Sequence, residues 1–321
     1  MAVSMRANRR FNIQIERWFC TVLGFILAIS APSELVISCD DSITEGGVGS
    51  EKVFNKTAKI FPSDDSFIII ANHQVYTDWV YSWIIAKLQN LDGNIKITLK
   101  ASLKNIPVFG WGMRFFEFIF LERSWDLDKS VLDKGLKKII RSEYPTALLL
   151  FPEGTTFTNR TKTKSVEFSE KMGLPHPNHL LIPRSTGMYH ILQQLRGNVT
   201  YLYDFTIGYT GVRPDEFAED KYTLTNIFYH GEYPHQTHVN IRRFKLDDIP
   251  TEESQFTIWL QEKFHEKDEL LANFYKNGTF HQQPNNTLQH FTIKNEIGTS
   301  ILQMMQIWIL PILIYLLFSI F

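Results

Sequence analysis

The chain has 321 residues and a mass of 37.5 kDa, enough for one large domain or two small ones. Its 33 basic and 34 acidic side chains give a formal net charge of -1, which argues against a nucleic-acid-binding protein. A hydrophobic content of 44% excludes an intrinsically disordered chain. The two cysteines, Cys20 and Cys39, exclude a disulfide scaffold or a cysteine-based zinc site, and so low a count fits a reducing compartment.

The first 40 residues are predicted to associate with a membrane. Residues 18–33 carry no charge, and Glu34 ends this stretch of 16 residues. Because a transmembrane helix needs about 20 apolar residues, both a full span and a shorter helix lying in one leaflet stay open, as does a cleaved signal peptide. Basic residues precede the stretch and acidic residues follow it, so the positive-inside rule places the N-terminus in the cytosol.

The middle of the chain is predicted to form one α/β domain over residues 41–276. Apolar runs predict strands, and helical spacing of apolar residues predicts helices between them. The strands are expected at 67–71, 95–99, 118–121, 147–151, 199–207 and 239–244, and the helices at 78–91, 127–143, 188–195 and 252–275. This alternation favours a sheet covered by helices on both faces.

The last part of the chain is predicted to cross a membrane. Residues 297–321 are 25 residues without a charge, and a helix of that length reaches ~37 Å, more than the hydrocarbon core of about 30 Å. Pro311 within it is tolerated better in lipid than in water. Residues 277–296 are polar and are expected to be a linker. The alternative for the last segment is a buried core helix.

A histidine and an aspartate stand five residues apart directly after the first predicted strand. His73 and Asp78 would face apart on one continuous helix, so they meet only if His73 lies on the turn and Asp78 in the first helical turn. A carboxylate bonded to one ring nitrogen raises the basicity of the other, which makes a general base. The alternative is a structural histidine at a helix cap.

Three further motifs contribute cations or a glycine turn. Glu153, Gly154 and Thr155 follow the strand at 147–151, and exposed N–H groups in such a turn favour anions. Arg123 ends the strand at 118–121, and Arg184 follows Pro183. The alternatives are an ordinary tight turn with solvated charges, an arginine in a surface ion pair and a helix cap at Ser185.

The order of these motifs resembles the glycerophospholipid acyltransferase family, which includes the 1-acylglycerol-3-phosphate acyltransferases. The resemblance rests on Asn-His-x4-Asp-Trp at 72–79, the apolar run ending in Arg123, Phe-Pro-Glu-Gly-Thr at 151–155 and Pro-Arg at 183–184. Residues 73–79 and 183–187, with Trp259 and Lys267, look like the lysocardiolipin and lysophosphatidylinositol acyltransferase branch. The resemblance implies a single mixed sheet covered by helices and covers residues 60–275. Members of the branch often carry more hydrophobic helices at both ends.

The resemblance implies transfer of an acyl group from acyl-CoA to the free glycerol hydroxyl of a lysophospholipid, in phospholipid synthesis or remodelling. The catalytic residues would be His73 and Asp78, and no acyl-enzyme would form. Substrate binding is implied for Arg123, Glu153, Gly154, Thr155 and Arg184. No cofactor or metal is expected beyond acyl-CoA as co-substrate. The expected location is the endoplasmic reticulum membrane, with the acyltransferase domain in the cytosol; mitochondria and lipid droplets are alternatives, and asparagine sequons keep a lumenal orientation open.

Three other functions share part of this pattern. A CoA-independent transacylase would take its acyl group from a phospholipid. A catalytically silent lipid-binding or scaffold protein would keep the fold, and a lipid hydrolase would use water, although the sequence has no Gly-x-Ser-x-Gly motif. Strict dependence on acyl-CoA would favour the predicted activity over a transacylase. The head group, among lysophosphatidic acid, lysophosphatidylinositol and lysocardiolipin, and the acyl-chain length are not predicted.

Overall fold

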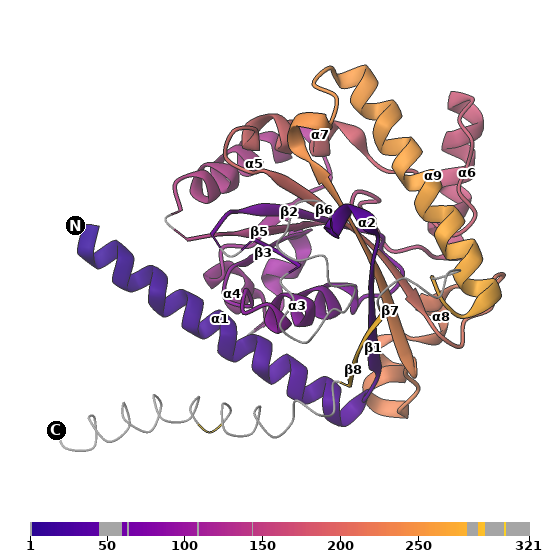
Figure 1. The fold of residues 1–321 in the computed structure, drawn as a ribbon, viewed down its shortest axis with the longest axis horizontal. Coiled ribbons are helices and arrows are strands. Elements are labelled where there is room, and N and C mark those ends of the chain that lie inside the picture. Colours follow the sequence, from indigo (N-terminus) through magenta and orange to yellow (C-terminus); the bar gives the residue numbers. More distant parts are fainter. Residues whose placement is uncertain are drawn as a thin grey trace.

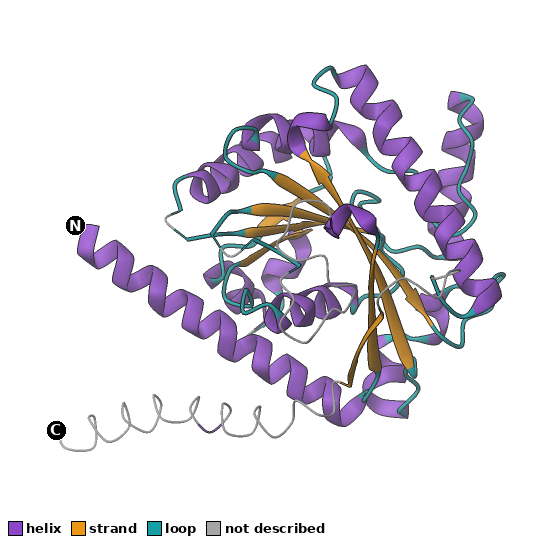
Figure 2. Cartoon of the chain, in the orientation of Figure 1, coloured by secondary structure: helices purple, strands orange, loops and turns teal. Residues whose placement is uncertain are grey.

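The computed structural model describes residues 2–44, 60–62, 64–107, 109–142, 144–280, 288–292 and 305. Their strands form one eight-stranded mixed sheet in the order β4-β3-β5-β2-β6-β7-β1-β8, with helices around it (Figures 1 and 2). The strands are β1 Glu34–Cys39, β2 Phe67–Ala71, β3 Ile95–Lys100, β4 Ile119–Leu121, β5 Ala147–Leu150, β6 Tyr201–Tyr209, β7 Gln236–Lys245 and β8 Leu288–Thr292. The predicted α/β class is confirmed, and each of the six predicted strands is present.

One half of the sheet is parallel and consists of strands β4, β3, β5, β2 and β6. In this half, strands alternate with helices along the sequence. Strand β7 is antiparallel to β6, β1 is parallel to β7, and β8 is antiparallel to β1. Every residue of β2 and β5 is buried. This explains why both strands read as continuous apolar runs, because helices cover both faces of a parallel sheet.

The helices cover the two faces of the sheet and create two hydrophobic cores. Helices α1 and α3 pack on one face, and α5, α7 and α9 pack on the other. The longer helices are α1 Ala2–Ser30, α3 Asp78–Leu88, α4 Phe109–Phe115, α5 Trp125–Ile140, α6 Asn159–Met172, α7 Ser185–Leu195 and α9 Glu253–Asn277. Short helical turns are α2 Asp41–Thr44, α8 Ala218–Lys221, η1 Ala101–Asn105, η2 Asn226–His230 and η3 Leu246–Asp248.

The folded domain includes residues that the sequence analysis assigned elsewhere. Strand β1 lies within the expected membrane-associating segment 1–40, yet it pairs with β7 inside the sheet, and Leu35 and Ile37 are buried in the core. Strand β8 lies within the expected linker 277–296 and pairs with β1. Neither strand was expected, because a short strand beside an apolar helix, or inside a polar stretch, changes the composition little.

Two of the longer helices, α4 and α6, were not predicted. Helix α6 contains only one buried residue, Ser169, so no apolar stripe marks it. Its signal is a capping box. The hydroxyl oxygen of Thr158 accepts from the backbone N–H of Thr161, and the hydroxyl oxygen of Thr161 accepts from the backbone N–H of Thr158. Helix α4 is short and contains two glycines, which hide the helical pattern.

One helix within the described residues has the length and apolar character of a membrane span. It is the part of α1 from Arg9 to Ser30, with a mean hydropathy of 1.4, and one third of its apolar window is buried against the domain. A core helix of a soluble protein or a signal sequence has the same character, so this property does not by itself make α1 a span. The predicted C-terminal span 297–321 lies outside the described residues except for Met305.

Candidate active site

The predicted site residues meet where the carboxyl ends of the parallel strands lie, which we call the site edge of the sheet. Strands β2, β4 and β5 belong to its parallel half, so their carboxyl ends lie on the same side. His73 follows β2, Arg123 follows β4 and Glu153 follows β5. Ligands of open α/β sheets bind outside the carboxyl ends of the strands, and this arrangement has that form.

His73 and Asp78 form a direct hydrogen bond. The Nδ1 atom of His73 lies 2.8 Å from Oδ2 of Asp78. His73 stands on the turn after β2, and Asp78 is the first residue of α3, as the five-residue spacing requires. Because the carboxylate accepts, Nδ1 carries the proton and the lone pair of the neutral ring is on Nε2.

The carboxylate of Asp78 is fixed by other donors as well. Oδ2 also accepts from the backbone N–H groups of Gln74, at 2.7 Å, and Val75, at 3.0 Å. The phenol of Tyr209, at the end of β6, donates to Oδ1. Burial raises the pKa of Tyr209 well above its usual range, and the nearby Asp78 adds to this, so the phenol keeps its proton. Asp78 is fully buried and is therefore rigid in position and orientation.

The second ring nitrogen of His73, Nε2, lies beside Thr156. Nε2 of His73 lies 3.3 Å from the hydroxyl oxygen of Thr156, and the side chain is 17% exposed. The ring stacks on Phe151, with centroids 4.5 Å apart. The imidazole is thus held on one edge and one face, while its lone pair lies next to a hydroxyl group.

Glu153 connects the two sides of the site. Its Oε1 accepts from the backbone N–H of His73 at 2.7 Å, and its Oε2 accepts from the N–H of Leu181 at 2.9 Å. Burial raises the pKa of Glu153 to about 8, and the two N–H donors act in the opposite direction. The resemblance implied that Glu153 binds substrate, but both carboxylate oxygens are already engaged with the backbone. Its contribution is to position the turns that carry His73 and Leu181.

Two more buried carboxylates fix loops at this edge in the same way. Asp128 accepts from the N–H groups of Glu122, at 2.7 Å, and Ser124, at 3.0 Å. Arg123 lies between them in the left-handed conformation, with a φ of 65°, which is uncommon for a residue other than glycine. Asp268 of α9 accepts from the N–H groups of residues 178 and 179, in the loop that leads to Leu181.

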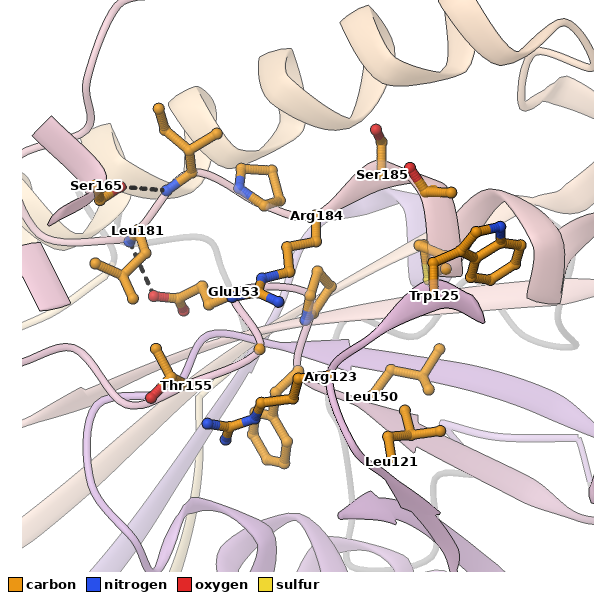
Figure 3. Close-up of a pocket in the computed structure, with 18 of the residues that line it drawn as sticks. Leu121, Arg123, Trp125, Leu150, Glu153, Thr155, Ser165, Leu181, Arg184 and Ser185 are labelled. Atoms are coloured by element: carbon orange, nitrogen blue, oxygen red, sulfur yellow. Dashed lines mark hydrogen bonds between the residues drawn. The ribbon is translucent and has the colours of Figure 1, made fainter. Parts of the chain in front are cut away.

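A pocket of about 800 Å³ opens beside these loops (Figure 3). Its lining includes all five predicted substrate-binding residues, namely Arg123, Glu153, Gly154, Thr155 and Arg184. The apolar lining comes mainly from α5, α6, α7 and the ends of β4 and β5. Phe151, on which His73 stacks, also lines it, so the pocket adjoins the histidine. A pocket with apolar walls and a cationic entrance fits an amphiphile that carries an anionic group.

Arg123 and Arg184 extend into the pocket from opposite sides of the Glu153–Thr155 turn (Figure 3). Within the part of the chain that the structure describes, neither forms an ion pair with a carboxylate. The pKa of Arg123 is lowered, first by partial burial and then by the neighbouring charge of Arg184. Two guanidinium groups that repel each other and lack a counter-ion favour a phosphate, which both can bind with two hydrogen bonds.

Gly154 makes room for one of these arginines. Its φ is +71°, and a Cβ atom there would lie 3.1 Å from Nε of Arg184. Any other residue would meet both the strained backbone and the guanidinium. Of the basic residues on α6, Lys164 lines the pocket, whereas Lys162 donates to the carbonyl of Asn178 at 2.9 Å.

Sequence reasoning assigned no role to Tyr209, Thr156, Asp128 or Asp268. Thr156 stands next to the recognised turn, which was its one available signal. The other three act on residues distant in the sequence or on backbone groups; Tyr209, for example, is 131 residues from Asp78. Such contacts leave no local pattern.

The site therefore combines a histidine–aspartate pair with an anion-binding pocket for an amphiphile, which is the arrangement of an acyl-transferring enzyme acting on lipids. The family model "Acyltransferase" matches residues 52–210, and "Acyltransferase C-terminus" matches residues 228–302. A 2-acyl-1-lysophosphatidylinositol acyltransferase of Saccharomyces cerevisiae is 33% identical over 332 residues, covering 93% of this chain and 83% of that protein.

Two other relatives are named for different acceptor lipids. A probable 1-acyl-sn-glycerol-3-phosphate acyltransferase 5 of Arabidopsis thaliana is 39% identical over 235 residues. Lysocardiolipin acyltransferase 1 of Gallus gallus is 35% identical over 236 residues. The alignments cover 72% and 71% of this chain, and 60% of each of these two relatives. The chain belongs to the acyltransferase family and is an enzyme of the lysophospholipid acyltransferase type.

Proposed function

We propose that the protein transfers a fatty acyl group from acyl-CoA to the free glycerol hydroxyl of a lysophospholipid. The observation that carries this proposal is the 2.8 Å contact between Nδ1 of His73 and Asp78, which leaves the lone pair of the neutral ring on Nε2, 3.3 Å from the Thr156 hydroxyl. A neutral imidazole in this tautomer accepts a proton from a hydroxyl group. The family implies an acyl donor and a lysophospholipid acceptor; the identity of the donor is part of the proposal.

In the proposed reaction, Nε2 of His73 takes the proton from the acceptor hydroxyl as its oxygen attacks the thioester carbonyl. The C–S bond then breaks, and the imidazolium returns the proton to the CoA thiolate. Asp78 stabilises the imidazolium between these steps. The products are the diacyl phospholipid and free CoA, and no residue of the chain becomes acylated.

The acceptor's phosphate would bind between Arg123 and Arg184, beside the backbone of Gly154 and Thr155. These four residues line the pocket, and the two arginines have no carboxylate partner among the described residues. Glu153 also lines the pocket, but both of its oxygens accept from the backbone N–H groups of His73 and Leu181, so it would act through these two residues. We assign it a positioning role.

The acceptor head group is proposed only as a class. Lysophosphatidic acid, lysophosphatidylinositol and lysocardiolipin each present a hydroxyl group near a phosphate. Relatives named for each of these acceptor types match this chain at 33–39% identity, so similarity does not choose among them. We further propose that the enzyme is bound to the endoplasmic reticulum membrane with its domain in the cytosol, where acyl-CoA is available.

The test is acyl transfer from labelled acyl-CoA to a panel of lysophospholipids, in membranes holding wild type or His73→Ala. His190→Ala is the matched control, because His190 forms a similar 2.6 Å contact with Asp133 on helices α7 and α5. The proposal requires product with wild type and His190→Ala and none with His73→Ala. Equal product from His73→Ala would refute the mechanism. Transfer only from a phospholipid donor would establish a transacylase instead.

A further inference from the structure

Polar contacts fix helix α1 to the α/β domain between residues 9 and 21. Glu16 is fully buried and lies 2.5 Å from Nζ of Lys96 in β3. One turn further on, the hydroxyl of Thr21 accepts from Lys87 of α3 at 3.0 Å. Near the N-terminal end, Arg9 lies 3.5 Å from Glu117.

Apolar contacts continue this attachment toward the end of α1. Cys20, Leu27 and Ala28 are buried in the core that α1 shares with α3. From residue 9 to residue 28 the attached length is about 28 Å at 1.5 Å per residue. A helix attached over that length cannot cross a bilayer alone, because it would carry Lys87 and Lys96 of the domain into the hydrocarbon core.

The opposite face of α1 is a stripe of large apolar side chains. Phe11, Val22, Ile26 and Ile29 follow one another at intervals of eleven, four and three residues, which places them on one side of the helix. Phe11 is 47% exposed and Ile29 is 64% exposed. A stripe of this kind on one side, with a polar and buried face on the other, is the pattern of a helix that lies in the plane of a membrane interface.

Helix α4 adds a second apolar surface next to α1. Phe109, Trp111 and Phe115 are each more than 40% exposed, and Trp111 reaches 62%. Phe109 makes an edge contact with Phe19 of α1, with ring centroids 6.4 Å apart, and α4 lies alongside α1 in Figure 1. The exposed basic residues Arg10 and Arg114 belong to the same two helices. We call the residues Phe11, Val22, Ile26, Ile29, Phe109, Trp111 and Phe115 the α1–α4 surface.

We propose that the α1–α4 surface docks on one leaflet of a lipid bilayer, with α1 lying parallel to the membrane and Trp111 at the same depth. Aromatic side chains prefer the interfacial region, and arginines beside them are attracted to anionic head groups. The acidic residues of α1 and α4 do not oppose this, because Glu16 is buried against the domain and α4 contains none. The same surface could instead be covered by a protein partner or by another segment of this chain. Measurements of depth in the membrane distinguish these occupants from lipid.

The experiment measures the depth of single labelled positions in the full-length chain. Phe11→Cys, Val22→Cys, Ile29→Cys and Trp111→Cys are made in a chain carrying Cys20→Ala and Cys39→Ala, and an environment-sensitive fluorophore is attached. The chain is reconstituted in phosphatidylcholine vesicles with a minority of phosphatidylserine, and doxyl lipids quench the label at shallow or deep positions. Ile258→Cys, on the exposed side of α9, is the matched control.

We expect all four labels on the α1–α4 surface to be quenched several-fold more by the shallow quencher than by the deep one, and the label at position 258 by neither. A label at position 22 deeper than those at 11 and 29 would show a membrane span and overturn the proposal. An unquenched label at position 111 would remove α4 from the membrane surface. Blue-shifted emission without quenching would identify protein as the occupant. These outcomes do not depend on the activity of the enzyme.

Discussion

The backbone nitrogen of His73 lies 2.7 Å from Oε1 of Glu153, a residue 80 positions away, and donates its hydrogen to that carboxylate. The other oxygen of Glu153 accepts from Leu181. The turn that carries the histidine and the loop that leads to Arg184 are therefore fixed to one side chain. The position of His73 depends on Glu153 as much as its tautomer depends on Asp78.

Glu153→Gln should reduce kcat about 10- to 100-fold. A glutamine has one acceptor oxygen, so its NH₂ group would oppose one of the two backbone N–H donors, and a buried donor left without a partner costs about 1–3 kcal/mol. The measurement is kcat and KM for acyl transfer, with a thermal melt of the same preparation. Unchanged kcat in a folded variant would show that Glu153 does not position the histidine.

Asp78→Asn should leave the chain folded and lower kcat by about 100-fold or more. The amide oxygen can accept from His73 and the two backbone N–H groups while its NH₂ faces the Tyr209 hydroxyl, but the negative charge that stabilises the imidazolium is lost. Tyr209→Phe removes a single donor from Asp78 and should cost about 10-fold. A larger loss in Tyr209→Phe than in Asp78→Asn would contradict this order.

Asp128→Asn should raise KM for the lysophospholipid about 10-fold with a smaller effect on kcat. The two oxygens of Asp128 fix the turn on which Arg123 adopts its left-handed conformation, so the substitution frees the guanidinium from its position without removing it. Asp126→Asn is the control, because Asp126 is exposed in the first turn of the same helix. The two variants should differ in KM, and equal values would exclude a specific effect of Asp128.

Gly154→Ala and Gly173→Ala separate backbone strain from crowding at the site. Both glycines have a positive φ, +71° and +65°, so each alanine should cost about 1 kcal/mol of stability. A Cβ at position 154 meets Arg184, whereas nothing lies within 4 Å of one at position 173. Melting temperatures should fall in both variants, but only Gly154→Ala should lose affinity for the acceptor. Similar acceptor KM values in both would argue against phosphate binding by Arg184.

The stability of the protein should decrease as pH rises from about 4.5 to about 8. Burial raises the pKa of Glu153 and of Glu219 to about 8, from an ordinary value of 4.5. A raised pKa in the folded state means that the stability contributed by the neutral form is complete below 4.5 and is lost as pH rises through 8. Above that range these two groups should cause no further change.

Glu219→Gln tests this pH dependence directly. Oε2 of Glu219 accepts from the backbone N–H of Tyr76 at 3.0 Å, and the amide oxygen of glutamine can replace it without a charge. Melting temperatures measured by tryptophan fluorescence across this pH range should fall less in Glu219→Gln than in wild type. Parallel curves would show that the carboxyl of Glu219 does not titrate within the range.

The central strands and the histidine–aspartate pair were predictable because their signals are local. The strands at 67–71 and 147–150 are continuous apolar runs, and the five-residue spacing of His73 and Asp78 permits one arrangement in which they meet. Strand β1 was missed because its apolar residues continue those of the preceding helix. The positioning role of Glu153 was missed because a side chain that bonds to distant backbone N–H groups shows nothing of this in its own neighbourhood.

The place of β1 in the sheet determines when the protein can complete its fold during synthesis. Residues 34–39 leave the ribosome early, but their partner strand β7 ends at Lys245, about 200 positions later. Until then, β1 presents an unpaired edge while α1 already has its exposed apolar stripe. Contacts so distant in sequence form slowly, and an unpaired edge favours aggregation. A nascent chain that rests α1 on a lipid surface would hold β1 close to a fixed position until β7 arrives.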